Sequence, residues 1–242
     1  MQKQLSDKQL EEFYHDNFVE EQVDDFLSLV GPLAHGAGVV VDMGGGVGFF
    51  ARRLADATSR VVRVVDADPN SVEACKRTGI PAAVGDALAP TIVGDEDMVC
   101  FNLILHHLVG SSEAITRQQQ SKALHVWLGK ARRIFINEYI YESYFGSLSG
   151  WLIFQITGSR ALSRIARIVA RVVPALRANT FGVGVRFRAR GDWIRLFRAA
   201  GYDVKASIEG DEEYVAPPLR LLLIKCIRRD SFLLEPAVVG PS

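Results

Sequence analysis

A run of glycines limits what this chain can fold into. Residues 39–50 read VVVDMGGGVGFF: an apolar segment ends in Asp42-Met43, three consecutive glycines follow, and Gly48 comes shortly after. Glycine adopts positive φ and lets other atoms approach the backbone closely. In doubly wound folds, a glycine-rich turn between the first parallel strand and the next helix binds a nucleotide. The run therefore predicts an α/β fold with a nucleotide-like ligand at this turn.

Apolar strands and helical segments alternate along most of the chain. The expected strands are 38–42, 61–66, 81–84, 97–102 and 132–138, and the expected helices are 47–57, 70–78 and 112–129. Asp68 and Ser112 have side chains suited to cap the starts of two of these helices. Continuous apolar strands separated by helices imply a mostly parallel sheet covered on both faces, as in Rossmann-like domains.

The C-terminal part predicts an antiparallel addition to this sheet. A helix expected at 191–200 precedes two strands expected at 202–208 and 219–227. The connection GDEEYVAPP is too short for a crossover helix, so these two strands should form a hairpin at the sheet edge. The fold class we expect is thus a doubly wound, seven-stranded, mostly parallel sheet with an antiparallel C-terminal hairpin.

Composition excludes several other classes of protein. Lys+Arg and Asp+Glu both number 28, so no excess of positive charge indicates a nucleic-acid partner. Cys75, Cys100 and Cys226 are far apart and form no CxxC pair, so we expect neither a metal site nor a disulfide framework. The polar N-terminal segment does not resemble a signal peptide, and no long uncharged apolar stretch predicts a transmembrane helix. We therefore expect a cytoplasmic protein.

The spacing of the glycines limits the class of ligand that this turn can bind. The pattern is Asp42-x-Gly44-x-Gly46-x-Gly48, and Phe49 stands where the nicotinamide-binding pattern GxGxxG would have its third glycine. A carboxylate at the strand end repels a pyrophosphate and attracts a cation. The residues favour a ligand that carries a positive charge and a ribose.

The pattern DxGxGxG after the first strand resembles motif I of the class I S-adenosylmethionine-dependent methyltransferases. Five further segments resemble later family markers, in the same order: VVDADP, VGDA, DMVCFNLILHHL, RRIFINEY and FRAAGYDV. The resemblance covers about 30–140 well and 190–228 moderately. Each motif alone is weak, but several in the correct order and spacing are specific.

This resemblance implies S-adenosyl-L-methionine as cofactor and S-adenosyl-L-homocysteine as product. It assigns Asp66 to the ribose hydroxyls and Asp86 to the adenine amino group, while Asn102 shapes a turn and contacts the cofactor through backbone groups. The residues that it implies in cofactor binding are Asp42, Gly44, Gly45, Gly46, Gly48, Asp66, Ala67, Asp86, Ala87, Asn102 and Leu103.

The position of other segments relative to the family pattern predicts a domain organisation. It consists of an N-terminal helical lid (1–31), a core (32–140 and 191–229), a helical substrate-cap insertion (141–190) and a tail (230–242). The insertion is too long for an ordinary loop and is rich in apolar and aromatic residues, which favours a bulky, hydrophobic small-molecule acceptor.

Few side chains are available as a general base. His106 and His107 follow the fourth strand at the rim where the acceptor should lie, although they could instead brace the loop; we prefer His107. Glu138 ends the fifth strand and could orient a substrate hydroxyl or amine, or satisfy backbone amides. Tyr139, Tyr141 and Tyr144 lie near the same edge and could line an aromatic pocket or pack under the insertion. His15, in the N-terminal helix, is a further alternative.

The second half of the insertion has the pattern of a basic amphipathic helix. Arg160, Arg164, Arg167 and Arg171 recur at helical spacing, and Ile165, Ile168, Val169, Val172 and Val173 fall on another face. Two interpretations are open. The helix could contact an anionic membrane surface through 160–173, or its apolar face could cap the domain while the arginines are solvated. The alternating arginines of RFRAR could bind a substrate anion or form the polar face of a strand.

The function that we expect is methyl transfer to a small, hydrophobic or aromatic molecule, with an oxygen acceptor favoured. Nitrogen and carbon acceptors remain open, as does a non-catalytic cofactor-binding protein of the same fold. The glycine spacing disfavours a nicotinamide-dependent oxidoreductase. A nucleic-acid substrate is disfavoured too, because FNLI stands at 101–104 where amino-methylating DNA enzymes carry an NPPY-type tetrapeptide. The sequence does not indicate an oligomeric state.

Overall fold

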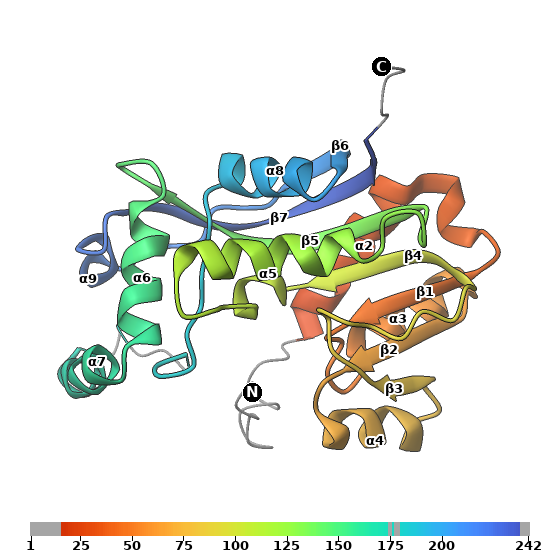
Figure 1. Cartoon of the computed structure of the whole chain (residues 1–242), viewed down its shortest axis with the longest axis horizontal. Coiled ribbons are helices and arrows are strands. Elements are labelled where there is room, and N and C mark those ends of the chain that lie inside the picture. Colours follow the sequence, from red (N-terminus) through yellow and green to blue (C-terminus); the bar gives the residue numbers. More distant parts are fainter. Residues whose placement is uncertain (1–15, 174–175, 177–179, 238–242) are drawn as a thin grey trace.

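One seven-stranded sheet organises the chain, and its strand order is β3-β2-β1-β4-β5-β7-β6 (Figure 1). This computed structural model describes residues 16–173, 176 and 180–237. The strands are β1 Val39–Met43, β2 Val62–Asp66, β3 Ala82–Val84, β4 Glu96–Asn102, β5 Arg133–Ser143, β6 Tyr202–Glu209 and β7 Ile224–Pro236. Only β7 runs antiparallel to its neighbours. The predicted mostly parallel sheet with an antiparallel C-terminal hairpin is confirmed.

Helices cover both faces of the sheet. They are α2 Asp16–Val30, α3 Phe49–Thr58, α4 Pro69–Arg77, α5 Glu113–His125, α6 Leu148–Gly158, α7 Arg160–Val172, α8 Arg190–Ala199 and α9 Pro217–Arg220, with 3-10 turns η1 Gly31–His35 and η2 Leu105–His107. Asp68 accepts hydrogen bonds from the amides of Asn70 and Ser71 and caps α4, and Ser112 caps α5, as predicted. No helix in the described part of the chain is long and apolar enough to cross a membrane.

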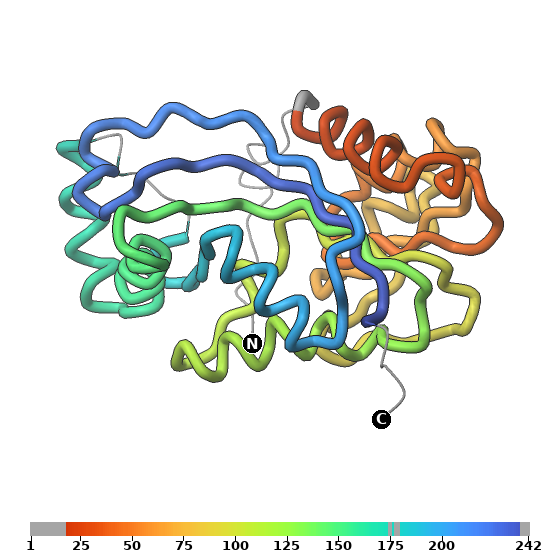
Figure 2. Tube along the Cα trace, turned by 90° about the horizontal axis from the view of Figure 1, so that it is seen from above, coloured from red at the N-terminus to blue at the C-terminus, as the bar shows by residue number. Residues whose placement is uncertain are grey.

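Alternate residues of each central strand enter two separate cores. Ile134 and Ile136 of β5 pack in the core under α5 and α8, whose largest buried side chains are Trp127, Trp193 and Tyr202. Phe135 points to the other face, where its ring lies 5.3 Å from that of Phe26 in α2. Figure 2 shows α2 on one side of the sheet and α5 and α8 on the other. Burial on both faces explains the continuous apolar strands.

The described part of the predicted N-terminal lid belongs to the core. Val23, Phe26 and Val30 of α2 are buried against the sheet. Gln22 donates to Asn137 of β5, and Ser231 of β7 donates to Asp25. The prediction of a lid is therefore wrong for α2, because its apolar stripe is used for packing. Residues 1–15, which include His15, lie outside the described residues.

The predicted C-terminal tail is wrong for residues 230–236. These residues form the second half of β7, the strand between β5 and β6. Asp230, Ser231, Phe232, Leu233 and Leu234 are all buried. The charged residues at 228–230 are accommodated within the strand, because the fully buried Asp230 pairs with Arg190 and Arg228. The strand expected at 219–227 instead begins at Ile224, after the short helix α9.

Strands β5 and β7 continue beyond the point where the other parallel strands end. Their ladder runs to the pair Ser143 and Ile224, so the boundary predicted at residue 141 falls inside β5. The inserted segment packs on this extension: Ile153 of α6 joins Val215, Ile224 and Ile227 in a third, small core. In Figure 1, α6, α7 and α9 lie at this end of the molecule, away from β1–β4.

Two adjacent residues of β7 provide a test of the corrected C-terminus. Leu234 is fully buried and pairs with Ile134, so Leu234→Ala should lower the free energy of unfolding by about 2–5 kcal/mol. Glu235 is partly exposed and pairs with Arg133, so Glu235→Ala should cost at most about 1 kcal/mol. Urea denaturation measures both. Equal, small effects would contradict a buried strand here.

Candidate functional site

The glycine turn after β1 is shaped by its conformation and by neighbouring side chains. Gly44, Gly46 and Gly48 have φ values of 72°, 55° and 84°, which glycine adopts without strain. A Cβ on Gly44 would lie 1.9 Å from Cδ1 of Ile104, and one on Gly45 would lie 2.3 Å from Oδ2 of Asp42. The sequence predicted that other atoms lie close to the backbone here. At Gly44 and Gly45 these atoms belong to the protein itself, to Ile104 and Asp42.

Asp42 lies beneath this turn and is fully buried. Its Oδ1 accepts a hydrogen bond from Nδ2 of Asn102 at 3.2 Å, while its Oδ2 has no partner among the described residues. Burial raises the pKa of Asp42 to about 7; the bond from Asn102 opposes this shift and the nearby charge of Asp66 adds to it. Oδ1 of Asn102 is a second buried acceptor without a described partner. Two unsatisfied acceptors favour a ligand that brings hydrogen-bond donors and positive charge.

Asp66, at the end of β2, joins the turn to the neighbouring strand. Its Oδ2 accepts from the amide of Gly46 at 2.9 Å, and its Oδ1 accepts from the amide of Asp68 at 2.8 Å. Burial raises the pKa of this carboxyl, although the amide bonds oppose the shift. Each carboxylate oxygen accepts more than one hydrogen bond, so this partly exposed group retains capacity for two hydroxyl donors.

Asp86 follows β3 along the same edge of the sheet. The amide of Gly85 donates to the carbonyl of Asp66 at 2.9 Å, which places Asp86 next to the end of β2. Its exposed side chain accepts from the amide of Leu88 at 2.8 Å. Ala67 is exposed and Ala87 is buried. The residues predicted to bind the cofactor thus form a continuous row along the ends of β1, β2 and β3.

The end of β4 completes this row with a strained residue. Leu103 has φ 53°, a left-handed conformation that is unfavourable for a residue with a Cβ. Its amide donates to the carbonyl of Asn137 at 2.8 Å, a bond that continues the pairing between β4 and β5. Such strain is concentrated at functional sites, and here it turns the chain sharply after Asn102.

Glu138, expected at the end of the fifth strand, lies inside β5 and connects this strand to η2. It is fully buried, and its Oε1 accepts from the amides of Leu105 at 2.6 Å and His106 at 3.4 Å. Its Oε2 lies 2.8 Å from Nδ1 of His106 and accepts from the amide of Tyr139 at 3.2 Å. Of the two roles open for Glu138, the geometry favours satisfying backbone amides, because both oxygens are already engaged. His106, bonded to this carboxylate and buried, braces the loop.

His107 differs from His106 in its environment. Its ring lies 4.2 Å from that of His106, and it makes no side-chain hydrogen bond to the described residues. Burial, together with the neighbouring His106, lowers the pKa of His107 well below 6.5. The imidazole is therefore neutral near pH 7 and retains a nitrogen able to accept a proton.

An aromatic cluster lies beside the two histidines on the extension of β5. The ring of Phe187 stacks on Tyr141 at 4.2 Å and lies 4.8 Å from His106. Tyr139 meets both His106 and Phe187 edge-on at 5.9 Å. Burial raises the pKa of both tyrosines, so they remain uncharged at neutral pH. The cluster forms an aromatic wall against His106, whose ring in turn neighbours that of His107.

Sequence reasoning missed the polar cluster that supports η2. Gln120 donates to the carbonyl of Leu105 at 2.9 Å and accepts from Nε of Arg188 at 2.8 Å. Glu113 pairs with Arg186 at 2.6 Å and with Arg188 at 2.7 Å. The idea that these arginines bind a substrate anion is wrong, because both are buried and paired. The alternation in RFRAR was visible in the sequence, but the burial of the arginines was not.

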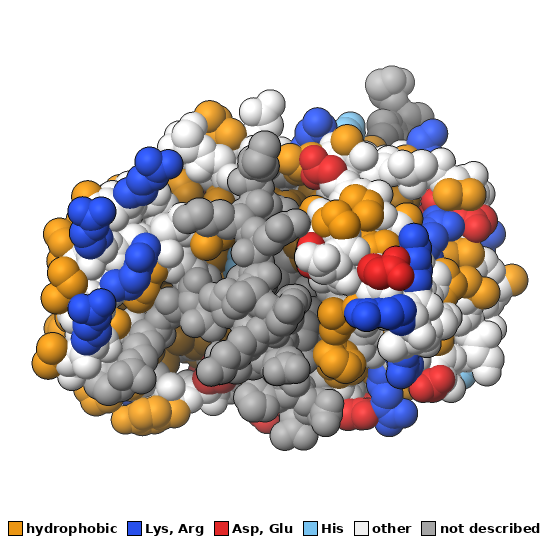
Figure 3. Space-filling view, turned by 90° about the horizontal axis from the view of Figure 1, so that it is seen from below, with side chains coloured by type: hydrophobic (Ala, Val, Ile, Leu, Met, Phe, Trp, Pro, Cys, Tyr) orange, Lys and Arg blue, Asp and Glu red, His pale blue; other side chains and the backbone are white. Residues whose placement is uncertain are grey.

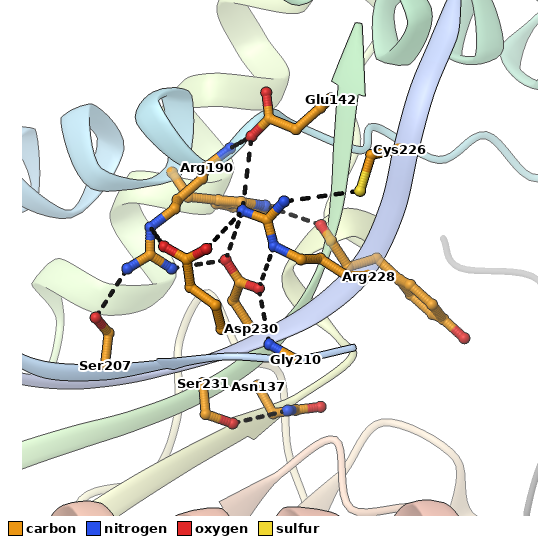
Figure 4. Close-up of polar contacts among 12 residues, drawn as sticks. Asn137, Glu142, Arg190, Ser207, Gly210, Cys226, Arg228, Asp230 and Ser231 are labelled. Carbon is orange, nitrogen blue, oxygen red and sulfur yellow. Dashed lines mark hydrogen bonds and ion pairs between the residues drawn. The ribbon is translucent and has the colours of Figure 1, made fainter. Parts of the chain in front are cut away.

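Arg190, the third arginine of this segment, is used inside the fold as well. It pairs with Asp230 at 2.6 Å and donates to Oγ of Ser207 at 2.8 Å. Figure 4 shows Arg190 and Arg228 converging on the carboxylate of Asp230 from two sides. The cluster joins the start of α8 to β6 and β7.

Comparisons with known proteins support the fold. No family model matches the sequence, and no curated protein matches it. Among solved structures, a methyltransferase dependent on S-adenosylmethionine from Clostridium acetobutylicum is similar, with a TM-score of 0.59, 9% identity and coverage of 90% of this chain and 92% of that one. The magnesium protoporphyrin IX methyltransferase of Synechocystis with bound S-adenosylhomocysteine has a TM-score of 0.56, 14% identity and coverage of 98% and 90%.

A third similar structure is the mitomycin 7-O-methyltransferase MmcR, with a TM-score of 0.55 and 14% identity. The match covers 90% of this chain but 54% of MmcR, so this chain spans about half of that protein's length. At such low identities, the similarity shows that the chain has the fold of the class I methyltransferases. The acceptor and the chemistry depend on the residues of the site.

The buried carboxyl of Asp42 predicts a pH-dependent effect of Asp42→Asn on stability. Because the folded protein holds this proton up to about pH 7 and the unfolded chain releases it near pH 3.8, wild-type stability falls as pH rises between these values. Asparagine does not titrate. The variant should therefore be more stable than wild type above pH 7, by at most about 4 kcal/mol, and the difference should shrink toward pH 4.

Urea denaturation of both proteins without added ligand, at pH 5 and pH 8, measures this difference. A stability difference that does not change with pH would contradict a raised pKa for Asp42.

Proposed function

We propose that this protein is an S-adenosyl-L-methionine-dependent methyltransferase that acts on a small, hydrophobic or aromatic molecule. The observation that carries the proposal is the pair of unsatisfied buried acceptors, Oδ2 of Asp42 and Oδ1 of Asn102, beneath the glycine turn. A cationic amino group would satisfy both and would stabilise the charged form of Asp42. The similar folds of known methyltransferases lend support.

The row of residues along the sheet edge suits the other parts of this cofactor. Asp66 has lone pairs left for the two ribose hydroxyls, and the exposed carboxyl of Asp86 suits the adenine amino group. When bound, the cofactor supplies an activated methyl group attached to a sulfonium. The carboxylates along this row also favour binding of the positively charged cofactor.

The acceptor that we propose is apolar and aromatic, because Tyr139, Tyr141 and Phe187 form the aromatic wall against His106, the neighbour of His107. A planar acceptor could stack against such side chains. Similar folds include an O-methyltransferase of mitomycin and a methyltransferase of magnesium protoporphyrin IX. An oxygen acceptor is favoured, because the neutral His107 can take a proton from a hydroxyl group. Nitrogen and carbon acceptors are the alternatives.

The three residues predicted to be catalytic take different parts in this proposal. His107 is the base, because it is neutral and its ring has no hydrogen-bond partner among the described side chains. Glu138 and His106 are positioning residues: their mutual bond and the amides of η2 hold His107 in place. Positioning accounts for much of the rate in a displacement whose leaving group is already good.

Calorimetric titration tests the cofactor. S-adenosylmethionine and S-adenosylhomocysteine should bind wild type with micromolar affinity, about −8 kcal/mol. Asp66→Ala should weaken binding roughly tenfold to a hundredfold, because two hydrogen bonds to a charged acceptor are lost. Asp56→Ala, which removes an exposed carboxylate from α3, is the matched control and should bind like wild type. Binding of NADH in place of both ligands would refute the proposal.

A methyl-transfer screen of phenols, amines and lipid-like aromatic compounds then identifies the acceptor. With an acceptor in hand, His107→Ala should lower kcat by about 10²- to 10⁴-fold and leave cofactor affinity unchanged. Wild-type kcat should be flat from about pH 6.5 upward, because the pKa of His107 lies well below 6.5. An unchanged kcat in the variant would exclude His107 as the base, and cofactor binding without any transfer would favour a non-catalytic protein.

A further inference from the structure

Helix α7 exposes an apolar face at the surface of the inserted segment. Leu162, Ile165, Ile168, Val169 and Val172 have exposed fractions of 43%, 59%, 57%, 42% and 82%. A row of exposed β-branched and leucine side chains on one helix is unusual in a surface that only meets water. Figure 3 shows hydrophobic and basic side chains side by side at this end of the molecule.

The helix attaches to the protein through a different face. Ser163 and Ala170 are its buried residues, and Oγ of Ser163 donates to the carbonyl of Ile156 in α6 at 2.8 Å. These side chains are small, so α7 lies close to the end of α6 without using its large apolar residues. The interpretation in which the apolar face caps the domain is therefore wrong.

The arginines of α7 lie on one face of the helix, and its large apolar residues lie on another. At about 100° per residue, Arg160, Arg164, Arg167 and Arg171 fall within an arc of about 60°, beside an apolar arc of about 120°. The thirteen residues of α7 include no Asp or Glu. The exposed face thus combines a continuous apolar strip with a parallel line of cations.

Such a face matches the surface of an anionic bilayer. An interfacial helix buries its apolar side at the boundary between headgroups and acyl chains, and basic side chains at its flank pair with lipid phosphates. A second copy of this chain fits less well: if two α7 helices met, neither would offer a carboxylate to the arginines of the other.

We propose that α7 docks this protein on the surface of an anionic phospholipid bilayer. Ile165, Ile168 and Val172 enter the boundary of the acyl chains, while the four arginines bind headgroup phosphates. The docking goes beyond the proposed methyl transfer and does not depend on it. It would place the inserted segment, and with it the aromatic wall on β5, near a source of hydrophobic molecules.

Co-sedimentation of the full chain with vesicles tests the proposal. Wild type should bind vesicles that contain phosphatidylglycerol and should bind vesicles of phosphatidylcholine alone much more weakly. Arg164→Gln/Arg171→Gln should weaken binding to the anionic vesicles about fivefold for each arginine removed. Ile165→Ser/Ile168→Ser should abolish sedimentation with them.

Matched controls change the same residue types elsewhere. Arg195→Gln/Arg198→Gln removes two mostly exposed arginines from α8, and Val61→Ser/Val93→Ser removes two exposed valines away from α7. Both should bind like wild type. All replaced α7 side chains are exposed, so the melting temperature of each variant should stay near that of wild type.

Three results would overturn the proposal. The first is equal binding to neutral and anionic vesicles, and the second is unchanged binding in both α7 variants. The third is a dimer of wild type in the absence of vesicles, measured by light scattering, that Ile165→Ser/Ile168→Ser dissociates. That last outcome would assign the apolar face to a second copy of this chain.

Discussion

The antiparallel ladder between β5 and β7 supports both halves of this molecule. Near Leu234, the ladder joins the parallel strands to the C-terminal hairpin and contributes to the core beneath α5 and α8. Beyond Glu138, the same two strands continue and carry the inserted helices. The aromatic wall therefore stands beside this ladder, while the row of acids lies at the ends of β1, β2 and β3 in the same sheet.

Local signals were sufficient to predict the central part of the fold. The glycine turn, the apolar strands and the caps at Asp68 and Ser112 depend on residues close together in the sequence, and the structure contains each of them. The second half of β7 could not be predicted in this way. The buried carboxylate at its start, Asp230, pairs with Arg228 and also with Arg190, which is distant in sequence. The strand conformation of this segment therefore depends on contacts with residues that are distant in the sequence.

The candidate site shows the same division. The sequence predicted Asp42 and Asp66 at strand ends, but the role of Glu138 depended on its hydrogen-bond donors, most of which come from η2. Helical periodicity likewise predicted that α7 is amphipathic, without showing which side packs. The small side chains of Ser163 and Ala170 decide that question, because they allow close contact where the larger apolar residues do not.

Behind the glycine turn, the thiol of Cys75 lies 3.3 Å from the carbonyl of Gly46, and a Cβ on Gly48 would come within 3.0 Å of its sulfur. Burial raises the pKa of this thiol to about 11, and burial also raises the pKa of Cys100 and Cys226. Almost no thiolate is present at neutral pH, and reagents reach this buried sulfur only when the structure around it opens locally. The rate of alkylation at Cys75 therefore reports how often the structure between α4 and the glycine turn opens, with the native thiol as the probe.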